Sequence, residues 1–179
     1  MGLKTKRLLL RGFKQYDLDD FYEYASKRGV GEWAGWKPHS SKEVSRAILE
    51  QFIGNPEVIA IEHRKTGKLI GSLGLHEKPF DENDDLYRQR ELGYVLSMDY
   101  WNQGLMSEAT RAIVDYAFNT LKLDRLSCAH FIGNKRSEAI IKKLGFTFEK
   151  YDTYYAKTLH KTFKEKKYIL YNPNKKSLK

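Results

Sequence analysis

The segment 100–109, Tyr-Trp-Asn-Gln-Gly-Leu-Met-Ser-Glu-Ala, contains residue types that suit a phosphate-binding turn. A strand-like run over 91–96 precedes it, and a helical run to about Thr120 follows it. A turn that leads from a strand into a helix presents unpaired backbone N–H groups, with the positive end of the helix dipole behind them. Gly104 lets the backbone of the turn approach a ligand closely. The spacing therefore predicts a site for a pyrophosphate group.

A second candidate helix start lies at 134–137, Asn-Lys-Arg-Ser, and Gly145-Phe146 follows eight residues later. Asn134 and Ser137 are residue types that helix N-termini favour, so plain capping is one interpretation of both. Together, the two helix starts indicate a phosphate-bearing cofactor.

The elements that would position these two turns follow the order βααβββαβαββ. Alternating and β-branched runs predict strands over 7–11, 58–61, 69–75, 91–96, 125–131, 147–155 and 168–171. Apolar residues at helical spacing predict helices over 18–27, between Ser40 and Gly54, from the Gly104 turn to about Thr120, and over 137–144. Asp17 is expected to cap the first helix, and Ser40 with Glu43 has capping-box spacing for the second. Because no repeat or linker interrupts this pattern, one domain is expected over 1–174, with a disordered basic tail over 175–179.

Composition limits the class of protein and its partners. A chain of 179 residues can bury a core without disulfide or metal staples, and one cysteine, Cys128, favours a reducing compartment. The sequence shows no apolar stretch of signal-peptide or transmembrane length, so a cytoplasmic protein without a membrane partner is expected. The net charge of +9 favours an anionic partner, but no nucleic-acid recognition motif is present, so nucleic acid is not the expected one. The histidines show no ligand spacing, and no metal is expected.

Four short motifs occur in order along almost the whole chain. They are Arg-Leu-Leu-Leu-Arg at 7–11, Glu-Leu-Gly-Tyr at 91–94, Tyr-Trp…Gly…Ser-Glu-Ala at 100–109, and Asn-Lys-Arg-Ser…Lys-Leu-Gly-Phe at 134–146. In this order and spacing the chain resembles the GNAT acyl-CoA N-acyltransferase superfamily, and within it the ribosomal-protein N-terminal acetyltransferases of the RimJ/RimL type. The resemblance implies an α/β (α+β) fold, with a mixed central sheet of about six to seven strands flanked by about four helices.

The resemblance also implies acetyl-CoA as the cosubstrate. The backbone of 94–96 would pair with the pantetheine arm as an added strand does, and an N–H near Leu96 would polarise the thioester carbonyl. The N–H groups of 103–107 would hold the pyrophosphate; Met106 stands where the superfamily has Gly or Ala, so the backbone is the expected contact. The cofactor-binding residues expected in this way are Tyr94, Val95, Leu96, Asn102, Gln103, Gly104, Leu105, Met106, Ser107, Asn134 and Ser137.

Acetyl transfer to an amine needs a base for the amine and a proton for the departing sulfur. Glu91 is the expected base, directly or through water, because it lies on the strand that would pass the reaction centre; an ion pair with Arg88 or Arg90 is the alternative. Ser137 would either cap the last helix or donate the proton to the thiolate. Many GNAT enzymes carry a tyrosine acid four residues before the glycine of the Gly-Phe pair, where this chain has Ile141.

The acceptor is less well defined by the sequence. Trp33 and Trp36 lie in the loop 29–39, which walls the acceptor site in the family, so they and Glu91 are expected to contact the acceptor; packing over a core edge is the alternative. The expected reaction is direct attack of a primary amine in a ternary complex, with a protein N-terminal α-amine as one acceptor. A small amine such as a polyamine or aminoglycoside, a non-catalytic acyl-CoA sensor, and a basic RNA- or ribosome-associated module are alternatives. The protein is expected to be a monomer or homodimer.

Overall fold

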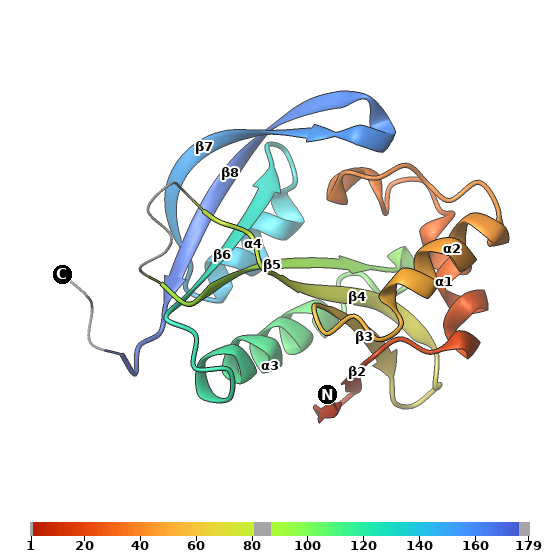
Figure 1. Ribbon diagram of the computed structural model, residues 1–179, viewed down its shortest axis with the longest axis horizontal. Coiled ribbons are helices and arrows are strands. Elements are labelled where there is room, and N and C mark those ends of the chain that lie inside the picture. The colour runs from red at the N-terminus through yellow and green to blue at the C-terminus, as the bar shows by residue number, and fades with distance from the viewer. Residues whose placement is uncertain (1, 81–86, 176–179) are drawn as a thin grey trace.

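Eight β-strands form one mixed sheet in the computed structural model of the protein, which describes residues 2–80 and 87–175 (Figure 1). The strands lie in the order β1-β2-β3-β4-β5-β6-β8-β7. Their bounds are β1 (Gly2–Lys4), β2 (Leu8–Arg11), β3 (Val58–His63), β4 (Leu69–His76), β5 (Gln89–Leu96), β6 (Arg125–Phe131), β7 (Thr147–Ala156) and β8 (Lys161–Tyr171).

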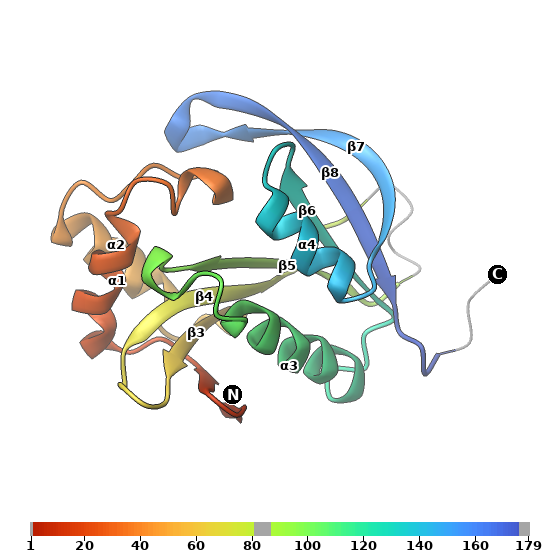
Figure 2. The ribbon, with the colours of Figure 1, turned by 180° about the vertical axis from the view of Figure 1, so that it is seen from behind.

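Four α-helices cover the two faces of this sheet (Figures 1 and 2). They are α1 (Leu18–Ala25), α2 (Lys42–Phe52), α3 (Leu105–Asn119) and α4 (Lys135–Lys143). Because side chains alternate along a strand, one set of β3 residues, Ile59 and Ile61, packs with α3 and α4, whereas Val58 and Ala60 pack with α1 and α2. The molecule therefore has two apolar cores, one on each face of the sheet. None of the helices in the described part of the chain is both long and apolar enough to cross a membrane.

The fold class and the order of elements expected from the sequence are confirmed. The sheet has one strand more than expected, because β1 adds an N-terminal edge strand, and β8 begins at Lys161 rather than at Tyr168. The first half of β8, Lys-Thr-Phe-Lys-Glu-Lys-Lys, has little intrinsic strand propensity. It is held by pairing with β7 on one side and β6 on the other, which no local pattern reveals.

Two local expectations are wrong in detail. The side chain of Asp17 does not cap α1; its carboxylate accepts hydrogen bonds from the Arg11 guanidinium and from the Lys14 N–H. The N-cap of α2 is Ser41 rather than Ser40, with its hydroxyl accepting from the Val44 N–H at 3.4 Å. In the predicted tail, Lys175 is anchored by its ammonium group to Asp124 and to the Lys122 carbonyl, while residues 176–179 lie outside the described part of the chain.

The strands β5 and β6 separate halfway along their length. They form the one parallel pair among the described strands, with registered partners only from Gln89↔Arg125 to Leu92↔Cys128. Beyond this point β5 continues along β4, whereas β6 continues along β8, and the two diverge (Figure 1). The separation leaves an open edge inside the sheet, which is where the chain places its candidate site.

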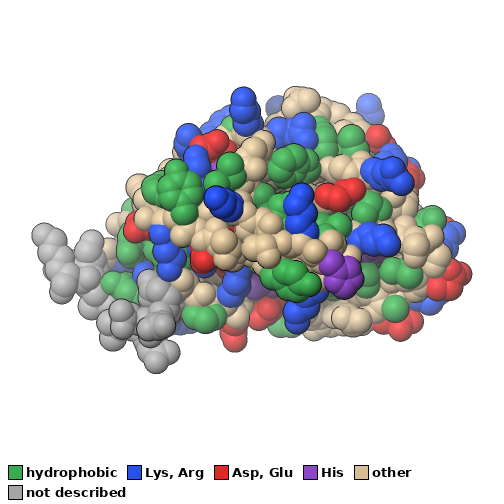
Figure 3. Space-filling view, turned by 90° about the horizontal axis from the view of Figure 1, so that it is seen from above, with side chains coloured by type: hydrophobic (Ala, Val, Ile, Leu, Met, Phe, Trp, Pro, Cys, Tyr) green, Lys and Arg blue, Asp and Glu red, His purple; other side chains and the backbone are tan. Residues whose placement is uncertain are grey.

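Lys and Arg residues are spread along the sequence rather than clustered in one segment. On the face shown in Figure 3, Lys and Arg side chains are interspersed with Asp and Glu and with hydrophobic groups. That face therefore carries no single basic stripe of the kind that follows a nucleic-acid backbone.

Candidate active site

A cavity of about 750 Å³ lies where β5 and β6 separate. Its walls come from segments far apart in the sequence: the loop between α1 and α2, the strands β4 to β6, the N-termini of α3 and α4, and the β7–β8 hairpin. The site residues expected from the sequence line this cavity, with the exception of Gln103. Gln103 instead directs its side-chain amide to the Asp99 carbonyl and its own carbonyl to Arg7.

The open edge of β5 directs backbone groups into the cavity. The Ser97 N–H donates to the Ile70 carbonyl of β4 at 2.8 Å. Because backbone groups alternate in direction along a strand, those of Tyr94 and Leu96 point the other way, toward β6. The Leu96 carbonyl is used by the Trp101 indole N–H at 2.9 Å. The Tyr94 backbone and the Leu96 N–H thus face the gap, available to a ligand that lies along β5 as a strand would.

The N-terminus of α3 closes one end of the cavity with free N–H groups. Asn102 and Gly104 both have left-handed backbone conformations, with φ of 59° and 73°. This alternation curls the chain into a concave turn whose N–H groups converge, as in other anion-binding turns. The first helical hydrogen bond is donated by Glu108 to the Gly104 carbonyl at 3.1 Å, which leaves the N–H groups of 105–107 without helical acceptors.

Arg7 supports this turn from behind. Its guanidinium donates to the Gln103 carbonyl at 2.8 Å and to the Glu108 carboxylate at 2.7 Å. The same carboxylate accepts from the Arg7 N–H and from the Thr5 hydroxyl. The segment before β2 therefore fixes the start of α3, a role that the sequence motif at 7–11 did not reveal.

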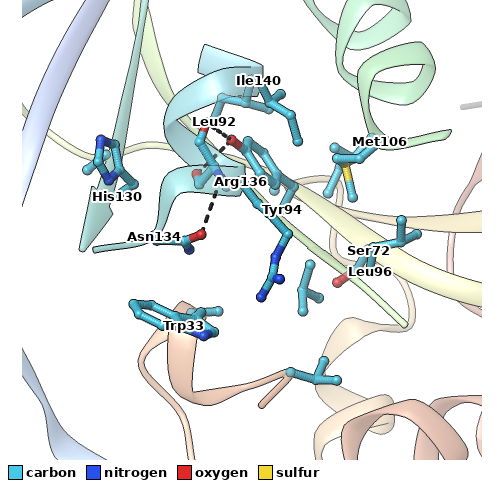
Figure 4. Close-up of a pocket in the computed structure, with 18 of the residues that line it drawn as sticks. Trp33, Ser72, Leu92, Tyr94, Leu96, Met106, His130, Asn134, Arg136 and Ile140 are labelled. Atoms are coloured by element: carbon cyan, nitrogen blue, oxygen red, sulfur yellow. Dashed lines mark hydrogen bonds between the residues drawn. The ribbon is translucent and has the colours of Figure 1, made fainter. Parts of the chain in front are cut away.

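The N-terminus of α4 lies across the cavity from this turn. Asn134 is the N-cap, and its side-chain oxygen accepts from the Ser137 N–H at 3.2 Å. The Ser137 side chain does not cap the helix; its hydroxyl lies 2.8 Å from the Tyr94 phenol oxygen (Figure 4). Burial raises the pKa of the Tyr94 phenol well above its ordinary value, so the phenol stays protonated. The structure thus joins the side chain of Tyr94, expected to contribute only its backbone, to Ser137.

Arg136 brings a positive charge between the two helix starts. Its guanidinium carbon lies 3.9 Å from the centroid of the Trp101 ring, a cation–π contact between α4 and the turn before α3. Both residues line the cavity, where Figure 4 shows Arg136 extending from α4. The cavity therefore combines free N–H groups and a guanidinium, which suits a ligand with phosphate groups.

Glu91 lies at the opposite end of the cavity. Its carboxylate accepts from the Lys78 ammonium at 2.9 Å, and its side chain is 17% exposed. The partner is thus Lys78; Arg90 pairs with Glu57 and Glu77 instead. A second carboxylate that sequence reasoning missed, Glu165 of β8, lines the same end. Burial raises the pKa of Glu165, with the Glu91 charge adding to the increase and Lys78 opposing it.

The loop between α1 and α2 forms an aromatic wall over this end. Trp33 and Trp36 both line the cavity, with Trp33 opposite Asn134 and Tyr94 in Figure 4. The loop is tied to the β7–β8 hairpin, because the Lys37 N–H donates to the Thr158 hydroxyl at 3.0 Å. Gly35, with φ of 86°, packs so closely that a Cβ there would lie 2.7 Å from the Tyr154 ring.

The residues that the sequence did not single out share one property. Lys78, Glu165, Arg7 and the Tyr94 side chain act through contacts with residues distant in sequence, so no local motif contains the signal. The four-motif pattern could have directed attention to Arg7, the first residue of the first motif. Among the described residues, no group of three or more His, Cys, Asp or Glu side chains could hold a metal ion.

Comparison with known proteins agrees with this geometry. A family model described as the acetyltransferase (GNAT) domain matches residues 7–147. The uncharacterized N-acetyltransferase YnaD of Bacillus subtilis is 30% identical over 149 residues, which cover 83% of this chain and 84% of that protein. The crystal structure of a GNAT-family acetyltransferase from Bacillus anthracis matches with a TM-score of 0.82 and 25% identity, covering 96% of this chain and 99% of that one.

The ribosomal-protein-S5-alanine acetyltransferase from Vibrio fischeri shares the fold, with a TM-score of 0.76 and 19% identity over 99% of this chain and 100% of that one. The family match spans the turn before α3, the open edge of β5 and the start of α4, which are the parts that build the cavity. The chain therefore belongs to the GNAT acetyltransferase family and is an N-acetyltransferase.

Proposed function

We propose that the protein transfers an acetyl group from acetyl-CoA to a primary amine, by direct attack of the amine while both substrates are bound. The observation that carries this proposal is the continuity of the cavity. An open strand edge, two helix N-termini and a carboxylate-bearing aromatic pocket meet in one space of about 750 Å³.

The residues fit acetyl-CoA in three ways. The Tyr94 backbone and the Leu96 N–H, which face the gap beside β5, match the amide groups of a pantetheine arm laid along that strand. The N–H groups of 105–107 and the positive end of the α3 dipole suit the pyrophosphate. The Arg136 guanidinium adds a charge-assisted donor on the opposite side.

When bound, acetyl-CoA supplies the acetyl group as a thioester. Glu91 accepts a proton from the acceptor ammonium, directly or through water, and so generates the free amine that attacks. The Leu96 N–H donates a hydrogen bond to the thioester oxygen as negative charge develops there. The Ser137 hydroxyl, held by Tyr94 at 2.8 Å, donates a proton to the departing sulfur, and the proton that the acceptor nitrogen loses as the amide forms restores the hydroxyl. Ser137 thus takes the role for which many GNAT enzymes use a tyrosine at the position of Ile141.

We infer that the acceptor is the α-amine of a polypeptide N-terminus. The inference is supported by the sequence similarity to RimJ/RimL-type enzymes, and by the aromatic wall of the cavity, where Trp33 is 40% exposed and Trp36 lies beside it. An N-terminal amine also carries a single charge, which suits a pocket where Lys78 already neutralises one carboxylate.

The test is release of CoA thiol from acetyl-CoA against a panel of amines: short peptides with free N-termini, the same peptides with blocked N-termini, polyamines and aminoglycosides. We expect release with free peptides and not with blocked ones. Release with polyamines or aminoglycosides alone would reassign the acceptor. Tight acetyl-CoA binding without release, for every amine and for folded ribosomal proteins, would contradict catalysis and favour a sensor.

A further inference from the structure

The Lys78 ammonium occupies the acceptor end of the cavity in the way a ligand ammonium would. It lies 2.9 Å from the Glu91 carboxylate and 5.9 Å from the centroid of the Tyr154 ring. Carboxylates and aromatic faces are the groups that proteins use to hold organic ammonium ions. Lys78 is half-buried, in the wall of the cavity.

A second carboxylate faces the same position. Glu165 lines the cavity and is 5% exposed, and it interacts electrostatically with both Lys78 and Glu91. Although burial alone would lower the pKa of Lys78, the Glu91 and Glu165 charges raise it above its ordinary value, so Lys78 stays charged. The neighbouring ion pair of Lys167 with Asp152, at 3.4 Å, also acts on Glu165, but its two charges have opposite effects on the Glu165 pKa.

The charges at this end of the cavity therefore amount to two carboxylates and one built-in ammonium. The remaining negative charge can be matched by one further ammonium group and not by two. A ligand that carries two ammonium groups would place its second charge against Lys78, with which it competes for the same carboxylates.

We propose that Lys78 is a specificity-determining residue that fills the second of two ammonium subsites, formed by Glu91 and Glu165, and restricts the acceptor to amines with one positive charge. This proposal rests on the proposed function for the identity of the ligand class. Its chemistry concerns binding alone, so it can be measured without turnover.

The experiment uses calorimetric titration of the protein, saturated with CoA, with two amines that share a six-carbon chain: hexylamine and 1,6-diaminohexane. The same titration with butylamine and 1,4-diaminobutane covers a shorter spacing between the charges. The variants are Lys78→Met, which keeps most of the length of the side chain and removes its charge, and Lys78→Arg, which keeps the charge. Lys65→Met, in the exposed turn between β3 and β4, is the matched control.

In the wild-type protein we expect the monoamine to bind at least as tightly as the diamine. In Lys78→Met the affinity ratio should shift toward the diamine by about tenfold or more, the usual scale for a charge-assisted contact in a partly buried site. Lys78→Arg and Lys65→Met should keep the wild-type ratio within about threefold.

The proposal would be overturned if the affinity ratio in Lys78→Met equals that of the wild type. It would also be overturned if Lys78→Met binds neither 1,6-diaminohexane nor 1,4-diaminobutane. A simple structural role for the Lys78–Glu91 pair would lower the melting temperature of Lys78→Met without moving the ratio. A shifted ratio without CoA release from acetyl-CoA would uphold the subsite and count against the proposed reaction.

Discussion

The role of Ser137 can be separated from helix capping by a single substitution, Ser137→Ala. The cap of α4 is the Asn134 side chain, which accepts from the Ser137 backbone N–H. Alanine retains that N–H, so the cap survives. What is lost is the hydroxyl, 2.8 Å from the Tyr94 phenol. The phenol still has the Ser137 carbonyl at 3.2 Å as an acceptor, so it is not left without a partner.

The two possible roles predict different magnitudes. Loss of one partly replaced hydrogen bond should lower the free energy of unfolding by about 1 kcal/mol or less. That corresponds to a fall in melting temperature of about 2–4 °C at most for a domain of this size. Loss of a general acid should lower turnover by roughly 10²–10⁴-fold, or about 3–5 kcal/mol in the activation free energy.

The assay is kcat for CoA-thiol release at saturating acetyl-CoA and acceptor, together with thermal unfolding of the same samples. Ser41→Ala is a matched control, since it makes the same chemical change at a true helix cap remote from the cavity. We expect Ser41→Ala to lower the melting temperature and leave kcat unchanged, whereas Ser137→Ala should lower kcat strongly with a fall in melting temperature of no more than about 2–4 °C. A kcat for Ser137→Ala within about threefold of wild type would refute the assignment of Ser137 as the acid.

Three further changes test other parts of the site. Glu91→Gln should lower turnover at neutral pH by roughly a hundredfold or more while acetyl-CoA binding persists, as measured by titration; unchanged turnover would remove Glu91 from the role of base. Arg7→Met removes the support behind the Gln103–Glu108 turn, so the affinity for CoA should fall about tenfold by calorimetry, whereas the exposed Arg46→Met should not change it. Burial lowers the pKa of His39 below its value of about 6.5 in the unfolded chain, so the stability that neutral His39 contributes is present above that pH and is lost as the pH falls toward the folded-state pKa. His39→Gln should therefore lose less stability than wild type in thermal unfolding between about pH 7 and pH 5, and equal losses would contradict this.

The sequence was informative where a local pattern determines the structure. The strand–turn–helix signal around Gly104 identifies the start of α3. The turn has a left-handed backbone at this position, with φ of 73°, which glycine adopts without steric cost. The choice between Ser137 as a cap and as a proton donor could not be made from sequence, since both roles favour the same residue types. In the structure the Ser137 hydroxyl lies beside the Tyr94 phenol and not at the helix cap. Tyr94 belongs to a strand more than forty residues earlier in the sequence.

Charged partners were the least predictable part of the site. The alternative to a catalytic role for Glu91 was an ion pair with Arg88 or Arg90, yet the sheet places Lys78 beside Glu91 and directs Arg90 to Glu57 and Glu77. Glu165 lies in a lysine-rich segment whose composition conceals a strand paired on both sides. Such partners depend on the register between strands that lie far apart in the sequence, and this register is a property of the assembled sheet.

The separation of β5 from β6 also bears on how the protein avoids association with itself. An unpaired strand edge at the outer margin of a sheet is a template for aggregation. Here the open edge lies between two strands of the same sheet, and the starts of α3 and α4 line the cavity beside it. A slender, flexible ligand can lie along it, whereas a strand of another molecule would have to pass between elements that are already packed. The fold can therefore keep backbone groups ready for a ligand without the aggregation risk that an exposed edge would carry.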